Sequence, residues 1–367
     1  MPIALLLFDQ PPDPKTAETT TTEHPNSVIV VAKLKLTLTK EEQQSIRQLS
    51  LHYRDALNFA SQVAFANQKT SSAKKLHNLT YYDLREKFHL PAQLACKVAR
   101  EVSAKYKGLW TKVKKNAEQR KMGITKKRFR GLDQAPHFSS RTYTLTYGHD
   151  YSLQTDLRTV RLMATGGRLK CRFAGYTKHL EWLKLGQIGE AKVWYDRSKN
   201  NYYLLVSMTL PTPNLQPTDI KTVRGIDLNQ RNISASTTRH GDVRFQYGCA
   251  PTRQQLISLR QLKQKLQRKG TPGAHRKLVQ LSQRERRLTA NVLYRATKEL
   301  AQPNILNGLE NLTDVTTRTG QKRKKGKKAS QKQRAANQKQ FSWSHAQYQA
   351  QLSYTAHGHR LRFCSGH

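Results

Sequence analysis

The first strong pattern along the chain is an alternation of apolar and polar residues in the segment VIVVAKLKLTLT, residues 28–39. Successive side chains of a β-strand point to opposite faces of a sheet, so this alternation predicts a strand with one buried face. The residues of that face are Val30, Ala32, Leu34, Leu36 and Leu38. The residues before it carry Pro, Thr and charge with little to bury, and they predict a disordered leader over residues 1–27.

Helical spacing follows the strand. Thr39 and Glu42 match the capping box that starts a helix, and apolar residues then recur at helical intervals. These residues are Ile46, Leu49, Tyr53, Leu57, Ala60 and Val63. A second helical region covers about residues 80–117, and Pro91 predicts that it forms two helices, because proline removes a backbone hydrogen bond from a helix interior.

The pattern then becomes that of strands. Gly166 and Gly167 predict the turn of one hairpin, because glycine tolerates the positive φ of tight turns. A second hairpin is predicted to turn between about Asp196 and Asn201. The segment PTPNLQPTD, residues 211–219, contains three prolines and predicts a linker. The first half of the chain is therefore predicted to be a β structure with a helical insertion.

A second unit is predicted after the linker. Three short strands are indicated by TVRGIDLN, ISASTT and VRFQYG, with RHGD as the turn before the third. Two long stretches within residues 252–302 carry leucine at helical spacing among Lys, Arg and Gln, and they predict helices compatible with an antiparallel pair. The segment NILNGLENLTDV then predicts an apolar strand that runs into Glu310.

The charge of the chain indicates its class of partner. The 367 residues include 65 Lys+Arg and 24 Asp+Glu, a formal net charge of +41, which favours a polyanion such as nucleic acid. The alternative is a basic ribosomal-type protein, or a surface whose charge only maintains solubility. The four cysteines form no C-x-x-C pair, which argues against a disulfide framework and a zinc ribbon and favours a reducing cytoplasm. No apolar segment reaches membrane length, so no membrane partner is expected.

Two segments concentrate this charge. The first, residues 114–131, predicts nucleic-acid contacts through Lys114, Lys115, Arg120, Lys121, Lys126, Lys127, Arg128 and Arg130. The second, residues 319–340, predicts such contacts through Lys322, Arg323, Lys324, Lys325, Lys327 and Lys328. A solvated basic loop is the alternative for the first segment, and a nuclear-localisation signal is the alternative for the second.

Asp227 and Glu310 are the candidate catalytic and metal-binding residues. Each is placed at a predicted apolar strand, and the helical insertion separates them. A carboxylate in an apolar strand is costly unless it is paired or holds a metal, and oxygen ligands suit the Mg²⁺ ions of phosphodiester hydrolysis. The alternatives are an Asp that caps a turn and a Glu on the surface. Actin-like ATPases carry a strand similar to GIDL, but Asn229-Gln230-Arg231 follows here in place of a Gly-Thr-rich phosphate turn.

The motifs VRGIDLNQRNISASTT, GLENLTDV and FSWSHAQYQAQLSYTAHGHRLRF, in this order, resemble the transposon-encoded TnpB (OrfB) family, the RNA-guided relatives of type V CRISPR nucleases. LTLTKEEQQSIRQL and LTYYDLREKFHLPAQLACKVAR resemble the front half of the same family, so the resemblance covers nearly all of residues 28–363. It implies an α/β plus β fold. A wedge-like N-terminal β-barrel domain, residues 28–215, would carry a helical recognition insert at about 40–131. A RuvC-like RNase H domain, residues 216–367, would follow, with its helical insertion at about 252–302.

The resemblance also implies roles and partners. Asp227 and Glu310 would be the first and second acids of the RuvC-like site, with Mg²⁺ as the cofactor. The partners would be a guide RNA from the transposon end and target DNA, bound in the bacterial cytoplasm at the nucleoid. A late helix is predicted to pack on the RNase H core through Trp343, Tyr348, Leu352 and Tyr354, with nucleobase stacking as the alternative.

The family pattern continues into a zinc ribbon of two C-x-x-C pairs and a third acid. This sequence instead ends in FCSGH, with Cys364 alone and no Asp or Glu after Asp314. The expectation is therefore an incomplete RNase H-like domain without zinc, in which Mg²⁺ is weakly held and DNA cleavage is impaired. A guided repressor that binds without cutting and a plain basic RNA-binding protein are the alternatives.

Overall fold

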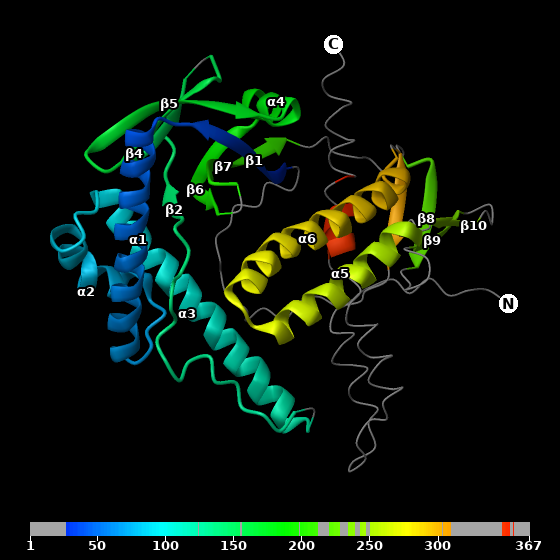
Figure 1. Cartoon of the computed structure of the whole chain (residues 1–367), viewed down its shortest axis with the longest axis horizontal. Helices are drawn as coiled ribbons and strands as arrows, with labels where there is room; N and C mark the ends of the chain where they lie inside the picture. The colour runs from blue at the N-terminus through cyan, green and yellow to red at the C-terminus, as the bar shows by residue number, and fades with distance from the viewer. Residues whose placement is uncertain are drawn as a thin grey trace.

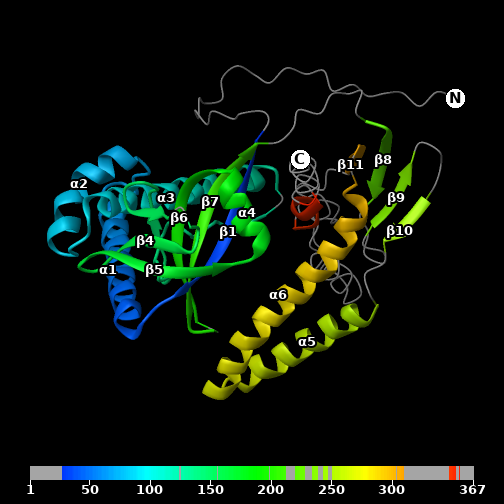
Figure 2. The ribbon, with the colours of Figure 1, turned by 90° about the horizontal axis from the view of Figure 1, so that it is seen from above.

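The structure is a computed structural model that describes residues 27–123, 125–154, 156–197, 199–211, 220–227, 234–238, 243–246, 250–302, 304–309, 347–352 and 355. The predicted leader up to residue 26, nearly all of the predicted linker, Glu310 and the basic segment 319–340 lie outside these ranges. The described residues form two sheets with separate hydrophobic cores, and the smaller sheet lies at the opposite end of the molecule from helices α1 and α2 (Figures 1 and 2).

The larger sheet is antiparallel throughout and has the order β2-β6-β7-β1-β5-β4-β3. Its strands are β1 (Ser27–Thr37), β2 (Tyr143–Leu145), β3 (Tyr151–Leu153), β4 (Thr159–Ala164), β5 (Gly167–Gly175), β6 (Gln187–Asp196) and β7 (Asn201–Pro211). β1 is the central strand, and its predicted face is buried from Val30 to Leu36 and half-buried at Leu38. The alternation that predicted this strand is confirmed.

Two tyrosines bring the outer strands of this sheet together. The Oη of Tyr151 on β3 donates to the carbonyl oxygen of Gly189 on β6 at 2.7 Å, beside a break in the β6–β7 register. The Oη of Tyr143 on β2 donates to the carbonyl oxygen of Met163 on β4 at 3.1 Å. Each bond joins strands from opposite ends of the sheet order, so the sheet is nearly closed.

Both hairpins form where the sequence predicted them. Ala164 pairs with Gly167, and Gly166 has a φ of +85°, in the region where glycine carries no steric cost. Asp196 pairs with Asn201 at the turn of the second hairpin. Helix α4 (Thr177–Leu185), between the two hairpins, was not predicted; it packs on β1 and β7, and tertiary contacts stabilise so short a helix.

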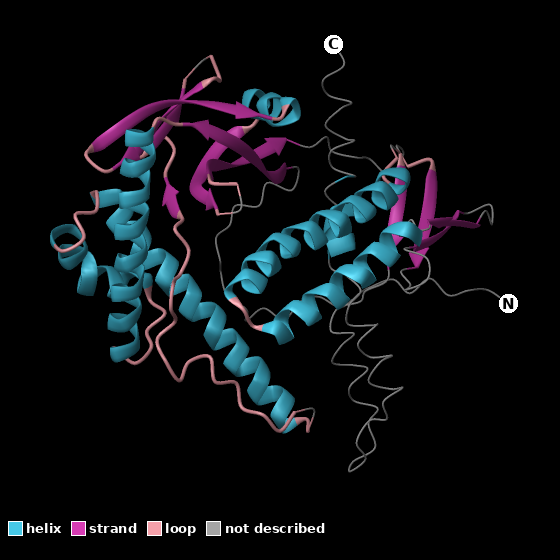
Figure 3. Ribbon diagram, in the orientation of Figure 1, coloured by secondary structure: helices cyan, strands magenta, loops and turns pink. Residues whose placement is uncertain are grey.

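Three helices follow the first strand: α1 (Lys40–Ala66), α2 (Ala73–Glu86) and α3 (Ala92–Lys121). Helices α1 and α3 contact the larger sheet, and α2 packs against these two helices (Figure 3). The predicted capping box is present, with Thr39 and Glu42 each bonded to the backbone N–H of the other. Pro91 immediately precedes α3, so the predicted division into two helices is confirmed, although α2 begins earlier than the sequence suggested. On α3, Lys97 pairs with Glu190 of β6, which ties the helix to the sheet.

The smaller sheet combines antiparallel and parallel pairs in the order β10-β9-β8-β11. Its strands are β8 (Thr222–Asp227), β9 (Ser234–Thr238), β10 (Val243–Gln246) and β11 (Ile305–Leu309), and β11 runs parallel to β8. The predicted helices are α5 (Ala250–Lys269) and α6 (Pro272–Leu300). Tyr348 and Leu352, in helical residues 347–352, are buried with Ile226 and Leu293, which confirms core packing for these two residues.

Helices α5 and α6 form the expected pair, and Glu285 joins them. Its carboxylate accepts from Lys263 Nζ at 2.6 Å and from Arg260 Nε at 3.1 Å. The hydrogen bond from Lys263 is the main cause that lowers the pKa of Glu285. The carboxylate is ionised near neutral pH and fixes the pairing of two otherwise strongly cationic helices.

Replacing Tyr151 by phenylalanine removes only the hydroxyl that joins β3 to β6. We expect the free energy of unfolding to fall by about 0.5–1.5 kcal/mol, because the part-buried hydrogen bond to the carbonyl of Gly189 is lost. Urea unfolding measures the change. Tyr176→Phe alters an exposed tyrosine and is the control, with an expected change below about 0.5 kcal/mol. An equal effect of the two substitutions would show that the hydroxyl does not hold the sheet edges together.

Candidate nucleic-acid interface and acidic strand end

The cationic residues predicted in the first basic segment lie on one projection of the molecule. α3 ends at Lys121, and the chain turns at Gly123, which has a φ of +71°. Residues 125–130 then return beside the end of α3 (Figure 1). All eight predicted residues are exposed: Lys114, Lys115, Arg120, Lys121, Lys126, Lys127, Arg128 and Arg130. We call residues 114–130 the basic projection.

Asn116 holds the two arms of the basic projection together. Its Nδ2 donates to the carbonyl oxygen of Lys127 at 3.1 Å, and its Oδ1 accepts from the N–H of Phe129 at 2.8 Å. Phe129 also packs against the core of the larger sheet. One amide and one aromatic ring therefore keep the cations of both arms side by side, where an extended phosphate backbone can contact them together.

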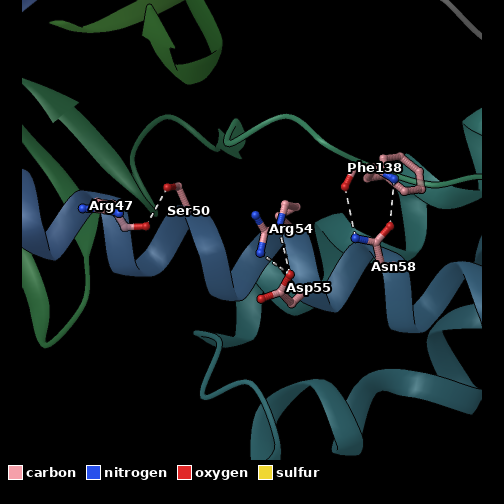
Figure 4. A network of polar contacts seen from close by, with 6 residues as sticks. All are labelled: Arg47, Ser50, Arg54, Asp55, Asn58 and Phe138. Carbon is pink, nitrogen blue, oxygen red and sulfur yellow. Dashed lines mark hydrogen bonds and ion pairs between the residues drawn. The ribbon is translucent and has the colours of Figure 1, made fainter. Parts of the chain in front are cut away.

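A second asparagine fixes the chain further along the same segment. The Nδ2 of Asn58 on α1 donates to the carbonyl oxygen of Phe138 at 3.0 Å, and its Oδ1 accepts from the N–H of Phe138 at 2.7 Å (Figure 4). Ser61 Oγ donates to the carbonyl oxygen of Pro136 at 2.7 Å. The connection from the basic projection to β2 is thus tied to α1.

Asp227 is the last residue of β8, and its side chain is exposed. Side chains alternate along the strand, so Arg224 and Ile226 are buried while Asp227 lies on the opposite face. Arg224 Nη1 donates to the carbonyl oxygen of Leu300 at 3.2 Å and fixes β8 against the end of α6. The sequence pattern suggested that this carboxylate would be costly to bury. Because the side chain is exposed, it carries no such cost.

Glu310 lies outside the described residues, but the strand before it is placed. β11 runs parallel to β8 with Leu309 beside Ile226, so both strands end at the same edge of the sheet. No group of three or more His, Cys, Asp or Glu that could hold a metal occurs in the described part of the chain. The pairing of Asp227 with Glu310 stays a prediction, and the six cations of the second basic segment are likewise not placed.

A cleft of about 830 Å³ lies between α1 and the β6–β7 hairpin, and sequence reasoning did not predict it. The described residues of its lining include Lys40, Gln43, Gln44, Arg47 and Gln48 on α1, with Arg141, Tyr195, Asn200 and Tyr202 on the other wall. The α1 residues recur at helical spacing, which was the available signal. The wall opposite could not be inferred, because it is about 100 or more residues away in sequence.

Comparisons with known proteins identify the type of fold. In the cryo-EM structure of the Cas12f1–sgRNA–target DNA complex, one chain matches at 11% identity with a TM-score of 0.52, covering 88% of this chain and 72% of that chain. At this identity the match shows a shared fold, a mixture of helices with a nearly closed antiparallel sheet. No protein-family model and no curated protein matches the sequence.

Two other solved structures match with lower scores. A CRISPR-Cas12f ternary complex gives 12% identity and a TM-score of 0.35, covering 88% of this chain and 71% of that chain. The mini-RNA-guided endonuclease CRISPR-Cas_phi3 gives 10% identity and a TM-score of 0.34, covering 93% and 77%. These scores are too low to support an argument. Separately, none of the described helices combines the length and apolar content needed to cross a bilayer.

Replacing Arg130 by glutamine tests the basic projection. We expect affinity for duplex DNA to fall and the slope of log affinity against log salt to flatten by about 0.9, because one exposed cation no longer displaces a counterion from a phosphate. The matched control is Arg54→Gln on α1, which removes one charge from a guanidinium that lies outside the basic projection and is already ion-paired with Asp55. A slope unchanged by Arg130→Gln, measured by fluorescence anisotropy, would exclude this residue from the interface.

Proposed function

We propose that this chain binds a guide RNA and uses it to recognise target DNA, as a protein of the TnpB type. The observation that carries the proposal is the fold, which matches 88% of the chain to Cas12f1, a protein solved in complex with an sgRNA and target DNA. The order of the sequence motifs adds the association with a transposon, because it resembles the TnpB family over nearly all of residues 28–363.

The distribution of charge supports nucleic acid as the partner. The net charge is +41, and the basic projection presents its cations on the surface. In RNA-guided recognition, base pairing reads the target sequence while the protein contacts the backbones and a short adjacent motif. Many exposed Lys and Arg residues on a rigid scaffold are what such backbone contacts require.

We assign the two sheets to two domains of this function. The nearly closed sheet and helices α1–α3 would form the wedge-like β-barrel domain, residues 28–215, with its recognition insert. The smaller sheet and helices α5 and α6 would belong to a RuvC-like RNase H domain, residues 216–367. The parallel pair of β8 and β11 supports this assignment, because ligands of open α/β sheets bind outside the carboxyl ends of the strands, where β8 ends in Asp227.

Asp227 and Glu310 are proposed to bind Mg²⁺ at this edge of the sheet. The exposed Asp227 carboxylate is a hard oxygen ligand, and Mg²⁺ is held in proteins by one or two carboxylates together with substrate phosphates. When bound, the metal would activate water and stabilise the leaving oxygen of a phosphodiester. The role of Asp227 itself is to orient the metal from a strand that Arg224 fixes against α6.

The proposal is tested by the RNA that copurifies with the full chain when it is expressed with the DNA flanking its gene. We expect one discrete RNA species from the transposon end, and binding of DNA whose sequence matches the variable end of that RNA. Bulk ribosomal RNA in its place would contradict guidance and support a plain basic RNA-binding protein. Equal binding of matched and mismatched DNA would contradict guided recognition.

The metal site is tested by Asp227→Asn and Glu310→Gln. Each should weaken binding of Mn²⁺, a spectroscopically visible substitute for Mg²⁺, by roughly tenfold or more, and should abolish any guided DNA cleavage. Guide RNA binding should stay within about twofold, because phosphates are bound by Lys and Arg and not by carboxylates. Asp83→Asn on α2, where the carboxylate pairs with Lys87, is the control. Unchanged Mn²⁺ binding, measured by electron paramagnetic resonance, would refute the site.

A further inference from the structure

The wall of the cleft formed by α1 is mostly polar, with Leu51 as the apolar residue among its described lining. Lys40, Gln43, Gln44, Arg47 and Gln48 recur at helical spacing and share one face of the helix. The opposite face of α1 carries apolar residues such as Ile46 and Leu49 into the core. The amides of this wall offer both donors and acceptors, and its cations offer donors alone. These groups complement a polar, anionic ligand.

The opposite wall is aromatic. Tyr195 on β6 pairs directly with Tyr202 on β7, and their rings lie 4.9 Å apart. The hydroxyl of Tyr195 donates to Asn200 Oδ1 at 2.7 Å, which fixes the orientation of the ring. Arg141 places its guanidinium carbon 4.6 Å from the centre of the same ring. Arginine stacked on tyrosine gives a flat, charged surface suited to a planar ring.

The backbone on both sides of Arg141 is fixed by contacts outside the cleft. Arg141 lies three residues after Phe138, which Asn58 binds through both its N–H and its carbonyl oxygen (Figure 4). The segment then enters β2 at Tyr143, whose side chain is fully buried. Arg141 is therefore anchored on both sides, so less conformational entropy is lost when it contacts a ligand.

The cleft concentrates positive charge. Lys40, Arg47 and Arg141 line it, and none of its described lining residues is acidic. Burial raises the pKa of Tyr202, while the nearby charges of Arg141 and Arg47 oppose this rise, so both guanidinium groups act on the same phenol. By contrast, Arg54, two helical turns further along α1, is paired with Asp55 at 2.7 Å (Figure 4).

We propose that this cleft binds one unpaired nucleotide of a single-stranded nucleic acid. The base stacks against the surface formed by Arg141 and Tyr195, and Arg47 and Lys40 contact its phosphate. The amides of Gln43, Gln44 and Gln48 are available to the edge of the base. A volume of about 830 Å³ lies within the range of known small-molecule sites. The inference rests on the proposed function, because it assigns one nucleotide of the bound strand to a specific site.

The ring of Tyr195 is tested by two substitutions that both remove its hydroxyl, of which only one keeps an aromatic ring. Tyr195→Leu should weaken binding of a short single-stranded oligonucleotide by about 5- to 100-fold, whereas Tyr195→Phe should stay within about threefold, because it keeps the ring. RNA and DNA oligonucleotides of the same sequence are compared, and the tighter one identifies the strand. With an oligonucleotide of abasic residues, wild type and Tyr195→Leu should bind equally.

The cations are tested by a matched pair on the same helix. Arg47→Gln should flatten the slope of log affinity against log salt by about 0.7, the value for one phosphate contact on a single strand. Arg54→Gln should leave this slope unchanged, because its charge is already paired with Asp55. Equal slopes for the two variants would overturn the assignment of a phosphate to Arg47.

Photo-crosslinking of the wild-type chain gives a measurement that needs no variant. Oligonucleotides containing thio-substituted uridine or thymidine should form adducts on peptides that contain Tyr195 or Arg141. A wild-type chain that binds no single strand would refute the proposed function as well as the cleft. Strong binding with adducts only on other peptides would refute the assignment of the nucleotide to the cleft, while leaving the proposed function standing. Displacement of the oligonucleotide by polyglutamate of equal charge would do the same, because polyglutamate carries no base that could stack.

Discussion

The larger sheet depends on the strict alternation of apolar and polar residues in β1. This strand lies between β5 and β7, so every apolar side chain on its inner face must be covered by other elements. Leu34 pairs with Leu204 of β7 and with Gly175 of β5, and the helices close the same core from outside. A slip of one residue would expose this face and bury Lys33 and Lys35. The remaining strands and helices are positioned relative to this one register.

A rigid core is also what lets the chain carry its charge. Like charges repel, and a net charge of +41 opposes compaction unless the cations are held apart on a stable surface. Two asparagines fix cationic segments on this surface: Asn116 ties the arms of the basic projection together, and Asn58 fixes the segment that leads to Arg141. These contacts make the positions of the cations part of the fold.

In the smaller sheet, the candidate functional group is a carboxylate at the end of a strand. Asp227 is exposed at the end of β8, while the buried residues beside it, Arg224 and Ile226, anchor the strand to α6 and to the second core. The parallel partner β11 ends at the same edge. A carboxylate held in this way is rigid without being desolvated, which is the condition under which it can accept a hydrated cation.

Local patterns were enough to predict β1, the capping box at Thr39, both hairpins and helices α5 and α6. Each of these depends on neighbours within a few residues, where periodicity, a proline or a glycine decides the backbone. Tertiary structure alone decided the near closure of the sheet by Tyr151, the short helix α4 and the exposure of Asp227. It also decided the meeting of α1 with Tyr195 across the cleft. These features join residues far apart in sequence, and no local propensity encodes which distant surface a side chain will meet.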